Sequence, residues 1–114
     1  TFYCRGLYQR AVADYTEAIR LDAEAANAFF FRANSQHHLG RADEAFSDYT
    51  ACLQIDPIRS DAFVGRGIVL AGKGEYDRAV EEFEAALLID PECVEAEAGL
   101  TRAVAARDRR LRGR

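Results

Sequence analysis

The chain has 114 residues, of which 49% are hydrophobic and 30% charged, a composition that fits one globular domain and leaves no room for a second. No apolar run approaches the roughly 20 residues that a membrane-spanning helix needs. We therefore expect a cytoplasmic protein without membrane contact. The net charge of −4 divides into −9 over residues 1–101 and +5 over residues 102–114. An acidic body of this kind argues against general nucleic-acid binding.

The first predicted element is an amphipathic helix that ends near Asp22. Val12, Tyr15 and Ile19 recur in it at three- and four-residue steps, which places them on one helix face. The same pattern returns twice, each time after 34 residues and without insertion or deletion. The three copies span residues 7–23, 41–57 and 75–91, and their shared columns are Ala11, Ala45 and Ala79, then Tyr15, Tyr49 and Phe83, then Asp22, Asp56 and Asp90.

A second type of helix is predicted between these copies, over residues 27–39 and 61–73. Gly40 or Gly74 follows each of these helices, and Gly6 occupies the same column before the first copy. Glycine suits the left-handed residue that a short turn between antiparallel helices needs. The unit is therefore a helical hairpin, and since one hairpin leaves an apolar face exposed, we expect successive hairpins to stack.

The last predicted element is a capping helix from Val94 to about Arg110, followed by a basic tail. Glu97 stands in the column of Phe29 and Phe63, which argues against another full hairpin. The positive charges of the arginine-rich end interact favourably with the dipole at the C-terminus of this helix. We expect these side chains either to be solvated or to contact an acidic surface. The apolar residues expected to cover the preceding hairpin are Val94, Ala98, Leu100, Val104 and Leu111.

The 34-residue period, the paired helices and the Asp-Pro pairs at Pro57 and Pro91 resemble the tetratricopeptide repeat family. The resemblance implies an all-α solenoid of helical hairpins, wound as a right-handed superhelix. Because the first copy lacks its leading part, we expect the chain to be a piece of a longer protein. The expected segments are a partial first repeat over residues 1–25, full repeats over 26–59 and 60–93, and a cap with a basic tail over 94–114.

Arrays of this family bind a peptide or helix in their concave groove, so the resemblance implies a non-catalytic adaptor or scaffold whose partner is a protein. Capture of the acidic C-terminal tails of heat-shock chaperones and a purely structural role in a larger assembly remain alternatives. Asn34 matches one position of the tail-binding clamp, whereas Asp61 would repel an acidic ligand. The expected groove residues are Asn27, Phe30, Phe31, Asn34, His38, Asp61, Val64, Ile68 and Arg102.

Three consecutive phenylalanines begin at Phe29 and span about 200° of helix, so they cannot all point into one core. Phe29 aligns with Phe63 and is expected in the core. Phe30 and Phe31 either pack against a neighbouring hairpin or form an anchor for a partner. We expect the partner's main contact to be apolar and to centre on Phe30, Phe31, Val64 and Ile68.

No arrangement of residues predicts catalysis, a metal site or a cofactor. Cys4, Cys52 and Cys93 are far apart and form no Cys-x-x-Cys pair, so we expect reduced thiols. His37 and His38 are adjacent, and their side chains diverge by about 100°, which prevents them from chelating one metal.

Overall fold

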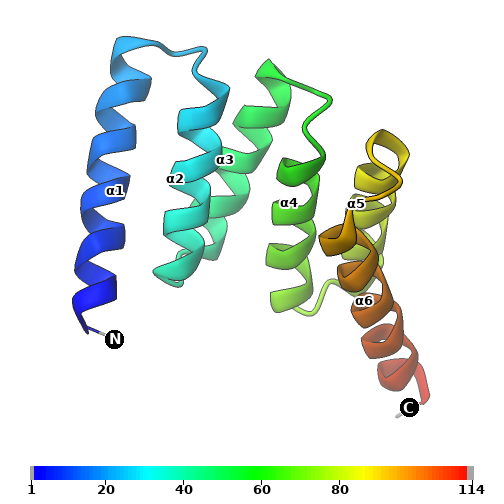
Figure 1. Cartoon of the computed structure of the whole chain (residues 1–114). Coiled ribbons are helices and arrows are strands. Elements are labelled where there is room, and N and C mark those ends of the chain that lie inside the picture. Colours follow the sequence, from blue (N-terminus) through cyan, green and yellow to red (C-terminus); the bar gives the residue numbers. More distant parts are fainter. Residues whose placement is uncertain (1, 113–114) are drawn as a thin grey trace. The chain divides into compact units, whose positions relative to one another are not determined.

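The computed structural model describes the backbone of residues 2–112 and the side chains of residues 5–112. These residues form six helices and no strand (Figure 1), which confirms the predicted all-α fold. The helices are α1 (Phe2–Leu21), α2 (Ala26–His38), α3 (Ala42–Ile55), α4 (Ser60–Gly72), α5 (Tyr76–Ile89) and α6 (Val94–Arg112).

The chain divides into two compact units. Unit 1 comprises Thr1–Pro57 with α1, α2 and α3, and unit 2 comprises Ile58–Arg114 with α4, α5 and α6. In unit 1, α2 packs against both α1 and α3. In unit 2, α4 packs against α5, and α6 contacts both of these helices. Each unit therefore contains one complete helical hairpin and one further helix.

The two hairpin turns have the same backbone geometry. Gly40 and Gly74 adopt φ angles of 79° and 82°, which lie in the left-handed region that glycine enters without the steric penalty of a Cβ. The backbone N–H one residue later donates to the carbonyl five residues before it, at 2.8 Å from Arg41 to Gln36 and 2.9 Å from Glu75 to Leu70. This is the Schellman closure, and it explains why glycine recurs in this column.

Gly6 does not form such a turn, so the prediction that all three glycines occupy turns was wrong. Gly6 lies inside α1, and among the described residues only Gly40 and Gly74 have a positive φ. A left-handed glycine is needed only where the chain reverses between two helices, and residues 2–21 form one continuous helix.

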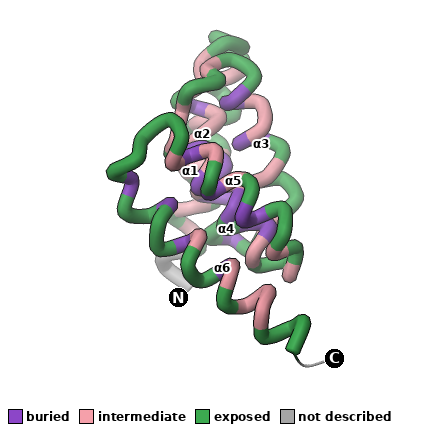
Figure 2. The backbone as a smooth tube through the Cα atoms, turned by 90° about the vertical axis from the view of Figure 1, so that its right-hand side faces the viewer, coloured by how far each residue is buried: buried purple, intermediate pink, exposed green. Residues whose placement is uncertain are grey.

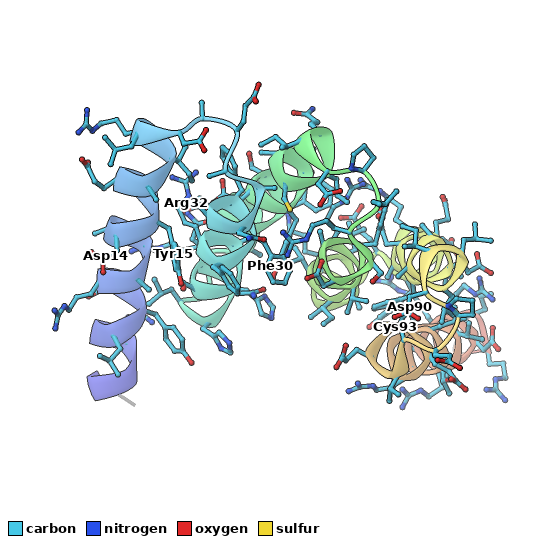
Figure 3. All side chains as sticks on the ribbon, turned by 45° about the horizontal axis from the view of Figure 1, so that its top comes forward. Asp14, Tyr15, Phe30, Arg32, Asp90 and Cys93 are labelled. Carbon is cyan, nitrogen blue, oxygen red and sulfur yellow. The ribbon has the colours of Figure 1, made fainter. Side chains whose placement is uncertain are left out.

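The acidic column shapes the loops that follow the long helices. The Asp22 carboxylate accepts the backbone N–H of Glu24 at 3.1 Å, and the Asp90 carboxylate accepts that of Glu92 at 3.2 Å. Such a side chain replaces a backbone partner in a turn. Figure 3 shows Asp90 in the loop between α5 and α6. The first copy has Ala23 where the others have proline, yet α1 ends at Leu21, which is equivalent to the last residues of α3 and α5, so the helix ends there without proline.

The core of each hairpin follows the small and aromatic columns. Ala45 is fully buried and Tyr49 is 2% exposed in unit 1, while Ala79 is fully buried and Phe83 is 1% exposed in unit 2. A Cβ added to Gly67 of α4 would lie 2.8 Å from the Phe83 ring. The helices therefore approach each other most closely where the sequence provides its smallest side chains.

An ion pair between the two helices recurs in both hairpins. Arg32 of α2 donates to both carboxylate oxygens of Asp48 of α3, each bond being 2.7 Å long. One period later, Arg66 donates to Glu82 at 2.8 Å. The side chains of these pairs are only 8–20% exposed, and Asp48 raises the pKa of Arg32 above its ordinary value through this bonding. Each pair connects the helices of its hairpin by charge-assisted bonds.

Phe29 was expected in the core together with the aligned Phe63, but both residues are only half-buried. The Arg32 guanidinium lies 5.6 Å from the centre of the Phe29 ring, and Arg66 lies 5.9 Å from that of Phe63. Each arginine thus covers the aromatic ring three residues before it while it binds the acid across the hairpin.

Gln36 occupies the column of the buried Leu70, and the ion pair of unit 1 accounts for this difference. Gln36 is 8% exposed. With its amide oriented to donate, its nitrogen lies 2.8 Å from Asp48 Oδ2 and 3.0 Å from the Glu44 carbonyl oxygen. The amide therefore completes the hydrogen bonding of the buried Asp48, which an apolar residue could not do.

The face expected to be covered in the capping helix α6 is covered only in part, since Leu100 and Val104 are half-buried and Ala98 is exposed. Its buried residues are Ala96, Gly99 and Ala103, whereas Val94 is 74% exposed and Leu111 is 59% exposed. A Cβ at Gly99 would lie 2.5 Å from the Phe83 ring. The cap therefore packs through its small residues, because Phe83 already fills the space that larger residues would take.

The last turns of α6 bind the turn between α4 and α5. Arg110 Nη1 donates to the Gly74 carbonyl at 2.6 Å, and the guanidinium lies 5.6 Å from the centre of the Tyr76 ring. Arg107 lies 3.5 Å from an Asp77 carboxylate oxygen. Figure 2 shows the end of α6 coloured as intermediate and then exposed. Part of the basic end is thus engaged within unit 2, while residues 113–114 lie outside the described part.

Candidate partner-binding surfaces

Aromatic side chains line the contact between α1 and α2 in unit 1. The Phe31 ring lies 5.8 Å from that of Tyr15, and His38 stacks on Tyr8 at 4.5 Å with an angle of 8° between the rings. Figure 3 shows Tyr15 between α1 and α2. The two stacked pairs are seven residues apart on both helices, which corresponds to about 10 Å along the axis. We call Tyr8, Tyr15, Phe30, Phe31 and His38 the unit 1 aromatic surface.

Phe30 and Phe31 differ in how much of each ring remains accessible. The half-buried Phe30 ring lies 5.3 Å from Phe31 and 5.9 Å from the buried Tyr49. Phe31 packs against Tyr15 but remains 43% exposed. Phe30 therefore packs largely inside the hairpin, while Phe31 combines contact with α1 and an open apolar surface.

The polar residues expected at the groove have partners of their own. The Tyr49 hydroxyl donates to the side-chain oxygen of Asn34, which leaves the amide N–H groups of Asn34 for another acceptor. Arg59 donates to both carboxylate oxygens of Asp61, at 3.1 and 2.9 Å, so Asp61 is less repulsive toward an acidic ligand than its isolated charge implies. Asn27 is exposed on the first turn of α2.

Val64 differs from the expectation that it lines an open groove. It is only 6% exposed, so its side chain offers almost no surface to a partner. Helical spacing fixes the direction in which a side chain points from the helix axis, but it does not show how far neighbouring helices cover that side of the helix. Ile68, one turn further along α4, is 44% exposed.

A pocket in unit 2 joins two of the expected residues, Ile68 and Arg102. Its volume is about 400 Å³, and it lies among α4, α5 and α6. Arg102 and Arg109 of α6 are among its lining residues, and no acidic residue lines it. We call this the unit 2 pocket, and its apolar lining includes Ile68, Ala71, Phe83, Ala103 and Ala106.

Sequence reasoning missed Arg109 and the aromatic residues of α1. Arg102 and Arg109 are seven residues apart, which places them on the same side of one helix, and this spacing could have been noticed. Tyr8 and Tyr15 have the same spacing. What such a pair of residues contacts depends on which helix lies opposite, and the spacing alone does not identify that helix.

The titratable groups of unit 1 include one histidine with an altered proton affinity. Burial, with a smaller effect of the adjacent His38, lowers the pKa of His37 below its ordinary value. Cys52 and Cys93 are both buried. Within the described residues, no three His, Cys, Asp or Glu side chains are grouped so that they could hold a metal ion. No described helix combines the length and apolar character needed to cross a membrane.

Comparison with known proteins identifies relatives that match most of the chain. Two family models, both described as tetratricopeptide repeat, match residues 2–59 and 60–93. The second such domain of human RPAP3, solved in complex with the HSP70 peptide SGPTIEEVD, is 30% identical, with a TM-score of 0.82 over 90% of this chain and 85% of that chain. The Arabidopsis OM64 domain is 28% identical, with a TM-score of 0.86 over 90% of this chain and 85% of that chain.

A third solved structure shows the same fold at lower sequence identity. The first tetratricopeptide repeat domain of human RPAP3 is 20% identical, with a TM-score of 0.90 over 99% of this chain and 89% of that chain. Comparison with curated protein sequences gave no match. These structures confirm the helical-hairpin solenoid as the fold class.

Proposed function

Because the chain belongs to the tetratricopeptide repeat family, we propose that it is a non-catalytic adaptor or scaffold that binds a peptide or helix of a partner protein. The proposed contacts are the exposed faces of α2 and α4, which are the first helices of the two hairpins, and of α6. Solved relatives include the human RPAP3 domain in complex with a peptide, which supports this mode of action.

The observation that carries this proposal is the exposure of Phe31. Its ring is 43% exposed in the middle of α2, beside Tyr15. Burying an apolar side chain contributes about 1.5 to 3 kcal/mol, against at most about 1 kcal/mol for an exposed ion pair. An aromatic group at the centre of a recognition face is a typical anchor. The unit 1 aromatic surface is thus suited to an apolar side chain of the partner.

The test is capture of partners by the chain and by Phe31→Ala, followed by mass spectrometry. Leu88→Ala is the matched control, because Leu88 is 86% exposed on α5 and lies outside the proposed faces. We expect Phe31→Ala to lose partners that Leu88→Ala keeps, with unchanged helicity and thermal midpoint. If both variants capture the same partners in the same amounts, the proposed role of this surface is wrong.

Binding of chaperone tails is a second candidate, favoured by the relative solved with an HSP70 peptide. The ion pair of Asp61 with Arg59 removes part of the expected repulsion, and Arg102 supplies a positive charge in the unit 2 pocket. The Tyr49 hydroxyl occupies only the side-chain oxygen of Asn34, so the amide N–H groups can still donate to a carboxylate of the ligand. The peptide SGPTIEEVD, titrated by fluorescence polarisation, should bind with micromolar affinity and weaken in Asn34→Ala if this candidate is correct.

A further inference from the structure

One side of α1 lacks the helix that covers the equivalent side of α3 and α5. In the two hairpins, the alanine and aromatic columns of the second helix are buried, and the first helix packs against them. Their counterparts in the first copy, Ala11 and Tyr15, are only half-buried. Leu7 lies one turn before Ala11 on the same side and is 48% exposed. We call Leu7, Ala11, Asp14 and Ala18 the uncovered side of α1.

Asp14 occupies the column of the acids that form ion pairs in the two hairpins. It lies 34 residues before Asp48, and Glu82 lies 34 residues after Asp48. Asp48 binds Arg32, and Glu82 binds Arg66, in each case an arginine of the first helix. Asp14 is exposed and forms no hydrogen bond or ion pair within the part of the chain that the structure describes (Figure 3). The uncovered side of α1 therefore lacks the arginine of a facing helix.

The start of α1 carries the motif that supplies this arginine in the hairpins. The motif is a phenylalanine, an arginine three residues later and a small residue directly after the arginine. It occurs as Phe29-Arg32-Ala33, as Phe63-Arg66-Gly67 and as Phe2-Arg5-Gly6. A Cβ at Gly67 would lie 2.8 Å from Phe83, whereas a Cβ at Gly6 would meet nothing within 4 Å. Arg5 is exposed and has no ion pair with any described residue. This third copy of the motif is thus open to a facing helix.

Arg5 cannot bind Asp14 of its own chain. Nine residues of continuous helix separate them, which is about 14 Å along the axis and two and a half turns, so the two side chains point to opposite sides of α1. Tyr8 stacks on His38, the last residue of α2, so the turn of α1 before Tyr8 extends beyond the end of α2 (Figure 1). A second copy can therefore reach Arg5 without displacing α2.

From these features we propose that the chain associates head to tail with further copies of itself through α1. The first turns of α1 in one copy lie antiparallel on the uncovered side of α1 in the next, in the register that the two helices of each hairpin have. Arg5 of one copy binds Asp14 of the next, and Gly6 lies against Tyr15. Because the two motifs lie on opposite sides of α1, the contact is heterologous and continues from copy to copy. This inference goes beyond the proposed function, since it does not use Phe31.

The test is sedimentation velocity of the chain from about 10 μM to 1 mM, a range suited to a weak contact of one helix pair. A reductant is present so that Cys4 cannot form a disulfide. The mean sedimentation coefficient should rise with concentration beyond the value for a dimer, and this rise should shrink at higher salt. Leu7→Ala should weaken association about two- to five-fold, whereas Leu21→Ala, beyond the point where the docked helix begins, should not.

Charge exchange tests the pairing itself, and it uses two exposed positions that the fold does not depend on. Arg5→Glu and Asp14→Arg should each weaken association at least about five-fold, because like charges then meet. An equal mixture of these two variants should associate as the parent does, since each supplies the charge that the other lacks. The double variant Arg5→Glu, Asp14→Arg should associate with itself but exclude fluorescein-labelled parent chain. Circular dichroism confirms that each variant keeps its helices.

Two results would overturn the inference. If the parent chain stays monomeric at about 1 mM, the uncovered side of α1 serves a different occupant. If the parent associates and both single charge variants associate equally well, the contact between copies lies elsewhere. Partner capture through Phe31 is measured separately and can succeed or fail independently of both results.

Discussion

Replacing Asp48 by asparagine should destabilise the protein far more than a change of one charge at the surface. Asp48 accepts two 2.7 Å bonds from Arg32, and their side chains are 8% and 19% exposed. Asp48→Asn leaves the guanidinium half-paired in a place that water barely reaches. Removing one partner of a buried pair costs about 3 to 5 kcal/mol, and since Arg32 keeps some contact with water, we expect about 2 to 3 kcal/mol.

The matched control is the exposed pair of Glu17 and Arg20. Their side chains are 56% and 68% exposed, so Glu17→Gln should cost far less stability than Asp48→Asn. Urea denaturation followed by circular dichroism measures both values. In a double-mutant cycle, the double variant Arg32→Leu, Asp48→Leu should be more stable than the single variant Asp48→Leu. The reason is that no buried charge then remains without a partner. Equal costs for Asp48→Asn and Glu17→Gln would refute this reasoning.

Three further predictions concern packing, pH and the end of α6. Gly99→Ala should destabilise unit 2 by about 1 to 3 kcal/mol in urea denaturation, because the added Cβ would lie 2.5 Å from Phe83, and Phe83→Leu in the same chain should relieve part of that cost. The lowered pKa of His37 means that the unfolded chain binds protons more readily, so the free energy of unfolding should fall as pH drops through the ordinary histidine range near about 6.5. His37→Gln should reduce that pH dependence, and an unchanged slope would contradict the assignment. Arg110→Ala should speed hydrogen exchange in the last turns of α6 while α5 stays protected, whereas equal exchange in parent and variant would show that the Tyr76 contact does not hold them.

The hairpins could be predicted because their signals are local and repeated. Period, face and turn are all fixed by residues close together in sequence, and the Schellman turns at Gly40 and Gly74 show that one residue type can define a turn. Gly6 shows the limit of this reasoning. Gly6 occupies the same column as the turn glycines, but its backbone conformation depends on whether the chain turns at that point into a second helix.

The ion pairs were missed because helical periodicity does not describe contacts across a hairpin. Arg32 and Asp48 are sixteen residues apart and lie on different helices, α2 and α3. Their recurrence as Arg66 and Glu82 at the 34-residue period could have revealed them, since an arginine and an acid keep their columns in both copies. For Gln36, only the position of the buried acid explains why a polar residue is tolerated.

The candidate surfaces were predicted in part, for a related reason. Ile68 and Arg102 were expected on one face, and they do line one pocket. Val64 was expected beside them but is buried. How far a flank is covered depends on the size of residues on other helices, and the small residues Gly99 and Ala103 let α6 approach closely.

The position of the Phe83 ring has a consequence for how unit 2 unfolds. The ring meets Gly67 of α4 and Gly99 of α6, so its burial is shared by all three helices. Detaching α6 would expose one of the most buried side chains of the chain, which makes the cap energetically inseparable from the hairpin before it. In repeat proteins, such terms between neighbours determine how far unfolding spreads from an end. The loss of α6 should therefore spread to α4 and α5 in one cooperative step, and fraying should be confined to the turns of α6 beyond Ala103.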